Sequence, residues 1–390
     1  MPYKNSITMV SHVFLQSDVA DPYALYHDRL SAQPVFWDAQ NRLWAIYSYA
    51  LCSEIFMSPD AHIPPVSTEG LDEYALAIIN RLVRLRNAPL HAAAKQAALL
   101  LFRHMQQPRV PDMMAELLPA KAGSWEIDWV DSVGRKLPVL SILRCFGIGR
   151  DESSFIAGRM DALLTLMQPV KTSAQVSIIN AMAKEVYMLL EKQLLGLGFI
   201  QEVINMLVST QAVSAEEALA LCVSNLAGLL IQSYDAGRGL LGNVLLQWLR
   251  HPAPALAGSD YIQAIITETL RYDPPVHNSR RVAAQDMRPG GYLIYKGQMI
   301  LLVMASANRD AQQFKDPARF DTQRHNNDAH LGFGLGAHQC VAQAFTTRLA
   351  VQALSFLTDT YKKVHLIDNN IAWEPLVNAR LPRHIFIACH

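Results

Sequence analysis

Cys340 ends a loop whose composition suits metal chemistry. The loop reads Phe-Gly-Leu-Gly-Ala-His-Gln-Cys from Phe333, and a helical pattern follows it over residues 341–349. A thiol must lose its proton to bind a metal, and backbone N–H groups at a helix start stabilise the resulting negative charge. Glycines such as Gly334 let the backbone pass close to a flat ligand, so the loop suits a thiolate ligand to haem iron. The alternative is a glycine-rich turn with a buried structural cysteine.

The other cysteines do not form a recognisable framework. Five cysteines are scattered along the chain, and an odd number is not expected of a disulfide-stapled protein. Cysteines that are scattered and odd in number suit a protein of a reducing compartment. We expect ordinary buried thiols at Cys52, Cys145, Cys222 and Cys389.

The pattern Phe-Gly-x-Gly-x-His-x-Cys from Phe333 to Cys340 resembles the haem-binding loop of the cytochrome P450 family. The resemblance implies a haem b cofactor with Cys340 as its axial thiolate, and it places Phe333 and Gly334 against the haem. A strongly donating thiolate favours O–O cleavage at the iron. The chain departs from the family at Ala342, where glycine is usual. Because alanine is also small, we expect at most a slight change in packing.

Glu268 and Arg271 place a carboxylate and a guanidinium three residues apart, on one face of an expected helix. Pairs at this spacing are common on solvated helices. In the P450 family, however, an E-x-x-R pair supports the cysteine loop, and an arginine from the intervening segment completes the network. We take Arg319 as that arginine, with Arg324 as the alternative. Further motifs in the family's order extend the resemblance over residues 268–350.

Haem carries two propionates, which need cationic or hydrogen-bonding partners. By resemblance, Arg281 and His338 occupy such positions. His91 and Lys95 lie four residues apart on an early helix, where the family shows His-x-x-x-Arg. Lysine can neutralise a propionate, although it lacks the bidentate fork of arginine. The alternative for His91 and Lys95 is a solvated helix face, and we expect His330 to be structural.

The stretch of residues 232–238 falls where the resemblance places the oxygen-binding side of the haem. The family has an acid followed by threonine there, and the two relay protons to dioxygen. This chain keeps the acid as Asp235 but has Ala236 in place of the alcohol. Since O–O cleavage needs protons, we expect a substrate hydroxyl or a substrate-held water to replace the threonine. Alternatives are a role for Ser233, the use of hydrogen peroxide, a rearrangement, coupling or desaturation, and a helix-surface role for Asp235.

The elements that must position these residues are predicted to be mostly α-helical, with small β-sheets. The resemblance implies the P450 fold, in which the haem is buried between a long central helix and the loop and helix that bear the cysteine. Residues 59–70, rich in proline, are expected to form a loop. Helical patterns cover residues 21–32, 90–105, 176–197 and 215–250, and hairpin or β-like patterns cover 34–38, 43–48, 292–295 and 299–304.

The long helix predicted at residues 215–250 contains several glycines, which are unfavourable inside a helix. They indicate that this helix is either locally distorted or closely approached by another segment. The glycines are Gly228, Gly237, Gly239 and Gly242.

Composition fits a large globular enzyme. Apolar residues make up 51% of the 390 residues and charged residues 17%, which suits a large buried core. Lys+Arg and Asp+Glu both total 34, and this balance argues against a nucleic-acid binder. No signal peptide or membrane-spanning N-terminal run is visible, so we expect a cytoplasmic protein without a membrane anchor. In the absence of repeats or linkers, residues 1–390 are interpreted as a single domain.

The resemblance implies a monooxygenase that uses dioxygen and a small-molecule substrate. No fused reductase is visible, so we expect electrons from a separate ferredoxin- or flavodoxin-type donor. Exposed arginines near the cysteine face are candidate contacts for that donor, although most surface arginines are simply solvated. These are Arg103, Arg109, Arg324 and Arg348.

The expected substrate pocket draws, by analogy with the family, on residues 59–86, 225–236, 276–279 and 376–377. Their mixed polarity suits a medium-sized secondary-metabolite intermediate, either free or presented by a carrier protein. The competing hypothesis is a haem-thiolate protein without oxygenase activity, such as a ligand-binding or sensor module or a redox-neutral isomerase.

Overall fold

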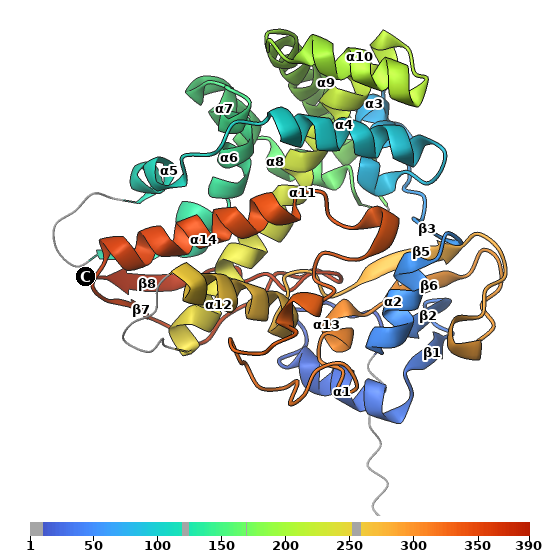
Figure 1. The fold of residues 1–390 in the computed structure, drawn as a ribbon, viewed down its shortest axis with the longest axis vertical. Coiled ribbons are helices and arrows are strands. Elements are labelled where there is room, and N and C mark those ends of the chain that lie inside the picture. Colours follow the sequence, from blue (N-terminus) through green and yellow to red (C-terminus); the bar gives the residue numbers. More distant parts are fainter. Residues whose placement is uncertain (1–10, 119–124, 169, 252–258) are drawn as a thin grey trace, which may run out of the picture.

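The computed structural model describes residues 11–118, 125–168, 170–251 and 259–390. Helices account for most of them, and two small sheets lie beside the helices (Figure 1), so the mostly helical fold class is confirmed. The α-helices are α1 (Pro22–Ala32), α2 (Tyr49–Met57), α3 (Glu73–Arg81), α4 (Leu90–His104), α5 (Val110–Leu117), α6 (Leu137–Cys145), α7 (Arg150–Ala157), α8 (Met160–Thr165), α9 (Ser173–Leu195), α10 (Ile200–Gln211), α11 (Ala215–Arg250), α12 (Ser259–Tyr272), α13 (Met304–Ala307) and α14 (Gln343–Thr360).

Short helical turns of other types link these helices and carry part of the functional region. One of them follows α3, and another lies in the loop that precedes α14. They are η1 (Val83–Leu85), η2 (Val130–Gly134), η3 (Pro289–Gly291), η4 (Asn327–Ala329) and η5 (Gly336–His338).

One sheet has the order β1-β2-β6-β5-β3 and the other the order β4-β8-β7. The predicted hairpin is confirmed, since β1 pairs antiparallel with β2. The central β2–β6 pair is parallel, which places residue 45 opposite residue 301. The strands are β1 (Val35–Asp38), β2 (Leu43–Ile46), β3 (Ala61–His62), β4 (Trp125–Asp128), β5 (Ser279–Ala283), β6 (Met299–Leu302), β7 (Val364–Leu366) and β8 (Phe386–Cys389).

Two of the expected short segments differ in the structure. Residues 292–295 are not a strand, because Ile294 forms only an isolated bridge with Met287. Residues 59–70 are not wholly a loop, since β3 pairs with β5 at the sheet edge. The run at 299–304 ends as a strand at Leu302, and α13 begins at Met304.

Helix α11 is central to the fold and packs against helices on several sides, including α3, α4, α6 and α9 (Figure 1). Its bounds match the predicted 215–250, and the Ser214 side chain caps its start by accepting from the Glu217 N–H at 3.1 Å. The helix is not distorted at its glycines. A Cβ at Gly239 would lie 2.3 Å from a methyl carbon of Leu381, and one at Gly237 would lie 2.8 Å from Pro138. The glycines therefore permit close approach.

The C-cap of α11 is His251, and Pro252 lies outside the described residues. Among the described residues, α11 alone has the length and apolar composition of a membrane-crossing helix, but 67% of its most apolar window is buried inside the protein. Such burial is usual for the core helix of a globular protein.

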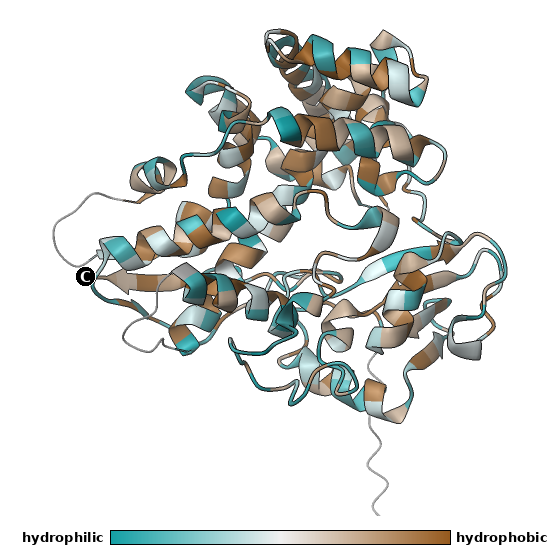
Figure 2. Cartoon of the chain, in the orientation of Figure 1, coloured by the Kyte–Doolittle hydropathy of each residue, from teal (hydrophilic) through white to brown (hydrophobic). Residues whose placement is uncertain are grey.

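The hydrophobic core is divided around α11. One cluster joins its first half to α3, α4, α6, α9 and α10, and a second joins its last half to α12, α14 and β8. Figure 2 shows hydrophobic and hydrophilic residues alternating along helices such as α10 and α14, as expected where one helix face is buried. Smaller clusters lie under the five-stranded sheet.

Candidate functional site

The cysteine loop closes on itself immediately before α14. The backbone N–H of Cys340 donates to the carbonyl of Phe333 at 3.0 Å, and Gly334 adopts a left-handed φ of 66°. Burial raises the pKa of the Cys340 thiol, while the N–H of Ala342 bonds the sulfur and lowers it. Ala342 has φ −94°, so alanine fits here without strain. The start of α14 therefore directs an N–H at the sulfur, as the sequence predicts.

A group of cationic side chains converges beside this loop. The rings of His91 and His338 are 4.3 Å apart, and the Lys95 ammonium donates to the carbonyl of Ala337 at 2.8 Å. Arg281 is buried on β5, and its guanidinium donates to Ser279 and to its own strand.

These basic side chains lack an acidic partner among the described residues. His91 Nε2 and His338 Nδ1 are both buried without a hydrogen-bond partner. The pKa of His338 is lowered to about 3, first by burial and then by neighbouring cations, chiefly His91 and Arg281. The buried His91 nitrogen argues against a merely solvated helix face. Unpartnered imidazole nitrogens beside Lys95 and Arg281 fit the two propionates of a haem, which can accept hydrogen bonds from all of these groups.

The middle of α11 is only partly buried on one face. Gln232, Ser233, Asp235 and Ala236 retain partial exposure, although their neighbours on both sides along the helix are buried. Partial exposure in the middle of a core helix indicates that this face borders an internal cavity. The Ser233 hydroxyl donates to the carbonyl of Leu230 at 3.0 Å, so its proton is already engaged.

Asp235 takes part in a chain of charges. Its carboxylate lies 2.9 Å from Arg238, which in turn lies 3.2 Å from Glu374. Burial is the main cause that raises the pKa of Asp235, and Arg238 opposes it. Glu374 also pairs with Arg135 at 3.2 Å. Asp235 is therefore a partly buried acid that is paired with Arg238, and the alternative of a helix-surface role stays untested.

Arg84, on η1, was not singled out from the sequence. It is exposed, yet protein surrounds it closely enough for burial to lower its pKa. Cys340 and Asp235 act against this lowering of the Arg84 pKa.

The Glu268–Arg271 pair is fully buried on α12, with the closest N–O distance 2.6 Å. The expectation that Arg319 completes this network is wrong. The Arg319 side chain is exposed, and only its carbonyl accepts from Arg271, at 3.1 Å. Arg324 fills the position, since its guanidinium lies 3.5 Å from Glu268 with a side chain only 6% exposed. The order of residues in the sequence could not decide which of the two arginines pairs with Glu268.

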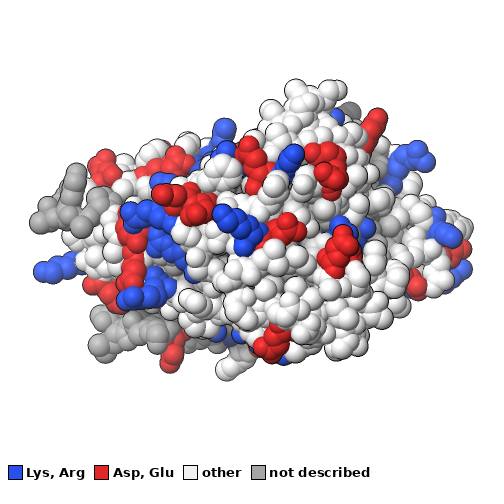
Figure 3. All heavy atoms as spheres, turned by 90° about the horizontal axis from the view of Figure 1, so that it is seen from above, with Lys and Arg blue, Asp and Glu red and all other residues white. Residues whose placement is uncertain are grey.

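A hollow of about 700 Å³ adjoins the other side of the cysteine loop, between α4 and α14. Cys340, Lys95 and Arg348 are among its lining residues. The expectation that Arg324 contacts an electron donor is wrong, because this side chain is buried in the Glu268 network. Figure 3 shows basic and acidic side chains intermixed over the face seen from above, including a group of basic ones toward one end.

The four segments expected to form the substrate pocket contact one another two by two. Val276 bridges Ala379, and the Asn278 side chain donates to the carbonyl of Val377 at 2.9 Å. On the other side, the Asn225 side chain accepts from the N–H of Val83 at 3.0 Å. The Asn278 hydrogen bond joins residues 276–279 to 376–377, and the Asn225 hydrogen bond joins residues 59–86 to 225–236.

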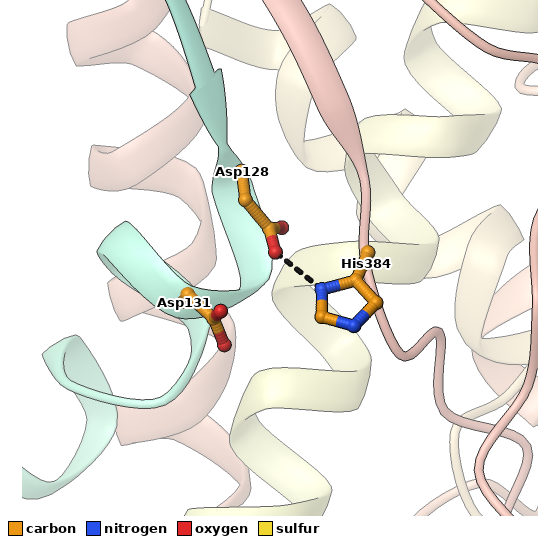
Figure 4. Close-up of side chains that lie close together, drawn as sticks. All are labelled: Asp128, Asp131 and His384. Atoms are coloured by element: carbon orange, nitrogen blue, oxygen red, sulfur yellow. Dashed lines mark hydrogen bonds and ion pairs between the residues drawn. The ribbon is translucent and has the colours of Figure 1, made fainter.

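Another cluster offers metal-ligand atoms away from this cavity. Potential ligand atoms of Asp128, Asp131 and His384 lie within 4.8 Å of one another (Figure 4). Asp128 bonds His384 at 2.6 Å and accepts from two backbone N–H groups, while Asp131 pairs with Arg135 at 3.0 Å. These contacts account for the cluster as a clamp between β4 and the segment before β8.

Comparisons with known proteins agree with this geometry. The family model for cytochrome P450 matches residues 255–355. The chain is 24% identical to the putative cytochrome P450 YjiB of Bacillus subtilis (strain 168), with 90% of each chain covered. It is 27% identical to 6-deoxyerythronolide B hydroxylase of Saccharopolyspora erythraea, with 68% of this chain and 67% of the relative covered. The solved structure of P450BioI in complex with hexadec-9Z-enoic acid ligated acyl carrier protein aligns with a TM-score of 0.78 at 20% identity, covering 95% of this chain and 99% of that one.

The fold and the cysteine loop define a haem-thiolate enzyme. The fold, the cysteine loop and the match to the family model all agree with the cytochrome P450 family, and relatives of this chain are named as a hydroxylase and an epoxidase, which are monooxygenases. The family's cofactor is haem with a cysteine thiolate as iron ligand. The unpartnered histidine nitrogens and the thiol bonded by a helix N–H fit that group.

Proposed function

We propose that this protein oxidises a medium-sized secondary-metabolite substrate with dioxygen at a haem b whose iron is bound by Cys340. The observation that carries the proposal is the Cys340 sulfur, which accepts the N–H of Ala342 beside basic side chains that have no acidic partner among the described residues. When bound, the haem supplies the activation of dioxygen, and the donor strength of the thiolate favours O–O cleavage. Residues 1–390 form one P450 domain in this proposal.

Four side chains hold the haem propionates in this proposal. Arg281 and His338 approach from β5 and the cysteine loop, and His91 and Lys95 approach from α4. Phe333 and Gly334 shape the loop, because the Phe333 carbonyl binds the Cys340 N–H and the glycine takes a left-handed φ. The pairing of Lys95 with a loop carbonyl links α4 to the cysteine loop.

Proton delivery uses Asp235 without a neighbouring alcohol. The raised pKa of Asp235 favours its protonated form relative to a free carboxyl group, while Arg238 limits the effect. Ala236 has no hydroxyl, and the Ser233 hydroxyl already donates to a helix carbonyl. A hydroxyl of the substrate, or a water held by it, therefore completes the path from Asp235.

Electrons come from a separate ferredoxin- or flavodoxin-type protein that docks at the hollow beside α14. The lining residues Lys95 and Arg348 supply positive charge there, and Arg103 is exposed on the neighbouring α4. Arg109 is less available, because it pairs with Asp112 at 2.9 Å. Acidic patches are usual partners for such a surface.

The substrate is either free or presented by a carrier protein. Support for a carrier comes from P450BioI, whose solved structure contains an acyl carrier protein ligated to a fatty acid. Support for a secondary-metabolite substrate comes from the hydroxylase of Saccharopolyspora erythraea. The protein acts in the cytoplasm, without membrane or nucleic acid, in keeping with its balanced charge.

The test is the carbon monoxide difference spectrum of the dithionite-reduced holoprotein, compared with Cys340→Ala and with Cys145→Ala, a buried cysteine far along the chain. We expect the thiolate-type Soret band in the wild type and in Cys145→Ala, and its loss in Cys340→Ala. A histidine-type spectrum that survives Cys340→Ala would overturn the proposal.

A second measurement separates the competing functions. Purified holoprotein is supplied with NAD(P)H and surrogate redox partners, or with hydrogen peroxide alone, and products are analysed for incorporated ¹⁸O from labelled dioxygen. Oxygen incorporation that requires the redox partners supports the monooxygenase. Products formed only with peroxide, or without any oxidant, would replace it with a peroxide-using or redox-neutral enzyme, and substrate binding without turnover would indicate a binding module.

A further inference from the structure

Arg238, on α11, is shared unequally between two carboxylates. Its guanidinium donates a hydrogen bond to Glu374 at 3.2 Å, whereas its contact with Asp235 is a 2.9 Å ion pair without hydrogen-bond alignment. The Asp235 oxygen in that contact, Oδ1, is buried and has no hydrogen-bond donor among the described residues. A carboxylate oxygen that receives no aligned N–H keeps its lone pairs free to bind a proton. Arg238 is thus aligned on Glu374 and not on Asp235.

Glu374 lies at the centre of a group of arginines. Its Oε1 also accepts from Arg135 at 3.2 Å, and its Oε2 lies 3.8 Å from Arg383. Arg135 in turn pairs with Asp131 at 3.0 Å. The Asp131 side chain is 56% exposed, whereas Glu374 is 15% and Arg238 7% exposed. Because water screens charges at the surface, the charge of Glu374 acts on its neighbours far more strongly than that of Asp131.

The turn that carries Glu374 is fixed against α11 by its backbone. The N–H of Glu374 donates to the carbonyl of Leu381 at 2.8 Å, and Trp373 forms a β-bridge with Pro382. The Leu381 side chain packs directly on Gly239 of α11. None of these contacts uses the Glu374 carboxylate. A glutamine at this position should therefore keep the turn in place and remove only the charge.

The chain of ion pairs is not itself a proton path. Arginine stays protonated in proteins, so neither Arg238 nor Arg135 can accept a proton and pass it on. The group acts through charge instead: burial raises the pKa of Asp235, Arg238 lowers it, Glu374 raises it and Arg135, on η2, lowers it. Arg84, on η1, also interacts electrostatically with Asp235.

Resting on the proposed function, we propose that Glu374 is a positioning residue that engages the aligned N–H of Arg238 and so leaves Asp235 able to take up and release the proton that oxygen activation needs. Without the charge of Glu374, Arg238 is free to turn onto Asp235 and hold it as a carboxylate through charge-assisted hydrogen bonds. Without Arg238, burial acts on Asp235 unopposed by that cation, and the proton stays to a higher pH. The two substitutions therefore act in opposite directions.

The test follows the proton on Asp235 without turnover. The ferric holoprotein is titrated with pH by infrared difference spectroscopy, and the carbonyl stretch of protonated Asp235 is assigned by subtracting the same protein with Asp235→Asn. We expect Glu374→Gln to lose this band at a pH about one unit lower than the wild type, the size of effect usual for one neighbouring charge. Arg238→Gln should lose it at a higher pH, and Glu374→Asp, which keeps the charge, should stay near the wild type.

The matched control is Asp131→Asn, which also removes a carboxylate paired with Arg135 but does so at the surface. It should leave the midpoint nearly unchanged. Shifts of the same sign in Glu374→Gln and Arg238→Gln would indicate structural damage and overturn the proposal, as would an unmoved midpoint in Glu374→Gln. The proposal also fails if Asp235→Asn removes no band at any pH, because Asp235 would then take up no proton in the folded protein.

Turnover tests the use of that proton. With surrogate redox partners and a probe substrate, the share of NADH electrons recovered as product should fall at a lower pH in Glu374→Gln than in the wild type, in step with the infrared midpoint. An infrared shift that leaves this pH profile unchanged would overturn the role of Glu374 in proton delivery. If the wild type incorporates no oxygen from dioxygen at any pH, the proposed function fails, and the signs of the infrared shifts still decide whether Glu374 controls Asp235.

Discussion

The guanidinium of Arg271 donates to both oxygens of the Glu268 carboxylate, at 2.9 Å and 2.6 Å, and neither side chain is exposed to solvent. The remaining donors of Arg271 bind carbonyls of Asn308 and Pro317. Glu268 in turn accepts from the N–H of Asp321 at 2.9 Å. One ion pair therefore holds the segment that leads from β6 toward the cysteine loop.

Replacing Glu268 by glutamine leaves the Arg271 charge buried without its counter-ion. We expect Glu268→Gln to lower the free energy of unfolding by about 3–5 kcal/mol, the usual cost of breaking a buried pair. Urea unfolding of the holoprotein, followed by circular dichroism and by the Soret band, measures it. Glu126→Gln on the exposed face of β4 is the control and should change little. Equal stability of the two variants would contradict the structural role of the pair.

Close packing at Gly239 gives a second prediction. A Cβ there would lie 2.3 Å from Leu381 and 2.7 Å from Pro275, so Gly239→Ala should cost about 1–3 kcal/mol through overpacking. The matched control is Gly198→Ala, where no atom lies within 4 Å of the added carbon. Thermal unfolding compares the two variants with the wild type. A stabilised Gly239→Ala would mean that α11 has more room than the structure gives it.

His330 makes the free energy of unfolding depend on pH. Burial lowers its pKa from 6.5 to about 4, so the unfolded chain takes up a proton between these values while the folded protein does not. Stability is therefore fully present above pH 6.5 and falls as the pH drops toward 4, by about 3 kcal/mol for this group. Urea unfolding at several pH values should show a shallower fall in His330→Gln. His277, whose pKa burial also lowers, keeps part of the dependence. An identical slope in wild type and variant would refute the role of His330.

Arg281 and Arg280 are neighbours on β5 that differ in burial, which makes them a matched pair. If Arg281 neutralises a haem propionate, Arg281→Gln should weaken haem binding by about tenfold, the loss expected for one charge-assisted contact. Arg280→Gln should leave it unchanged. Haem transfer to apomyoglobin, followed by absorbance, measures the difference. Similar transfer rates for both variants would remove Arg281 from the haem site.

Ala236→Thr restores the alcohol that other members of the family carry. If a substrate hydroxyl or water completes the proton path, probe substrates without a hydroxyl should be oxidised inefficiently by the wild type. For these probes, Ala236→Thr should lower the share of NADH electrons lost as hydrogen peroxide by at least about twofold. Ala236→Val, of similar size but without the hydroxyl, should not. A gain in both variants would assign the effect to cavity shape.

Local patterns predicted most of the framework. The bounds of α11 follow from its helical periodicity and its Ser214 cap, and the hairpin of β1 and β2 follows from its alternating residues. The choice between Arg319 and Arg324 could not be made this way, because it depends on how the chain between α12 and the cysteine loop turns back.

The contacts around the middle of α11 also could not be predicted from the sequence. Arg84 lies in a stretch of ordinary composition, and the packing of its short helix η1 against α11 arises from contacts that join residues 142 or more positions apart, such as Val83 with Asn225. Glu374, which ties Arg238 to Arg135, is distant in sequence from both. Interactions of this range are set by tertiary packing, which single-sequence patterns do not record.

Lys95 makes two kinds of contact. It lines the outer hollow beside α14, and its ammonium donates to the carbonyl of Ala337 in the cysteine loop. An acidic side chain of a docked electron donor would compete with that carbonyl for the same ammonium. If the donor docks at this hollow as proposed, Lys95 would be a side chain shared by the docking surface and the cysteine loop.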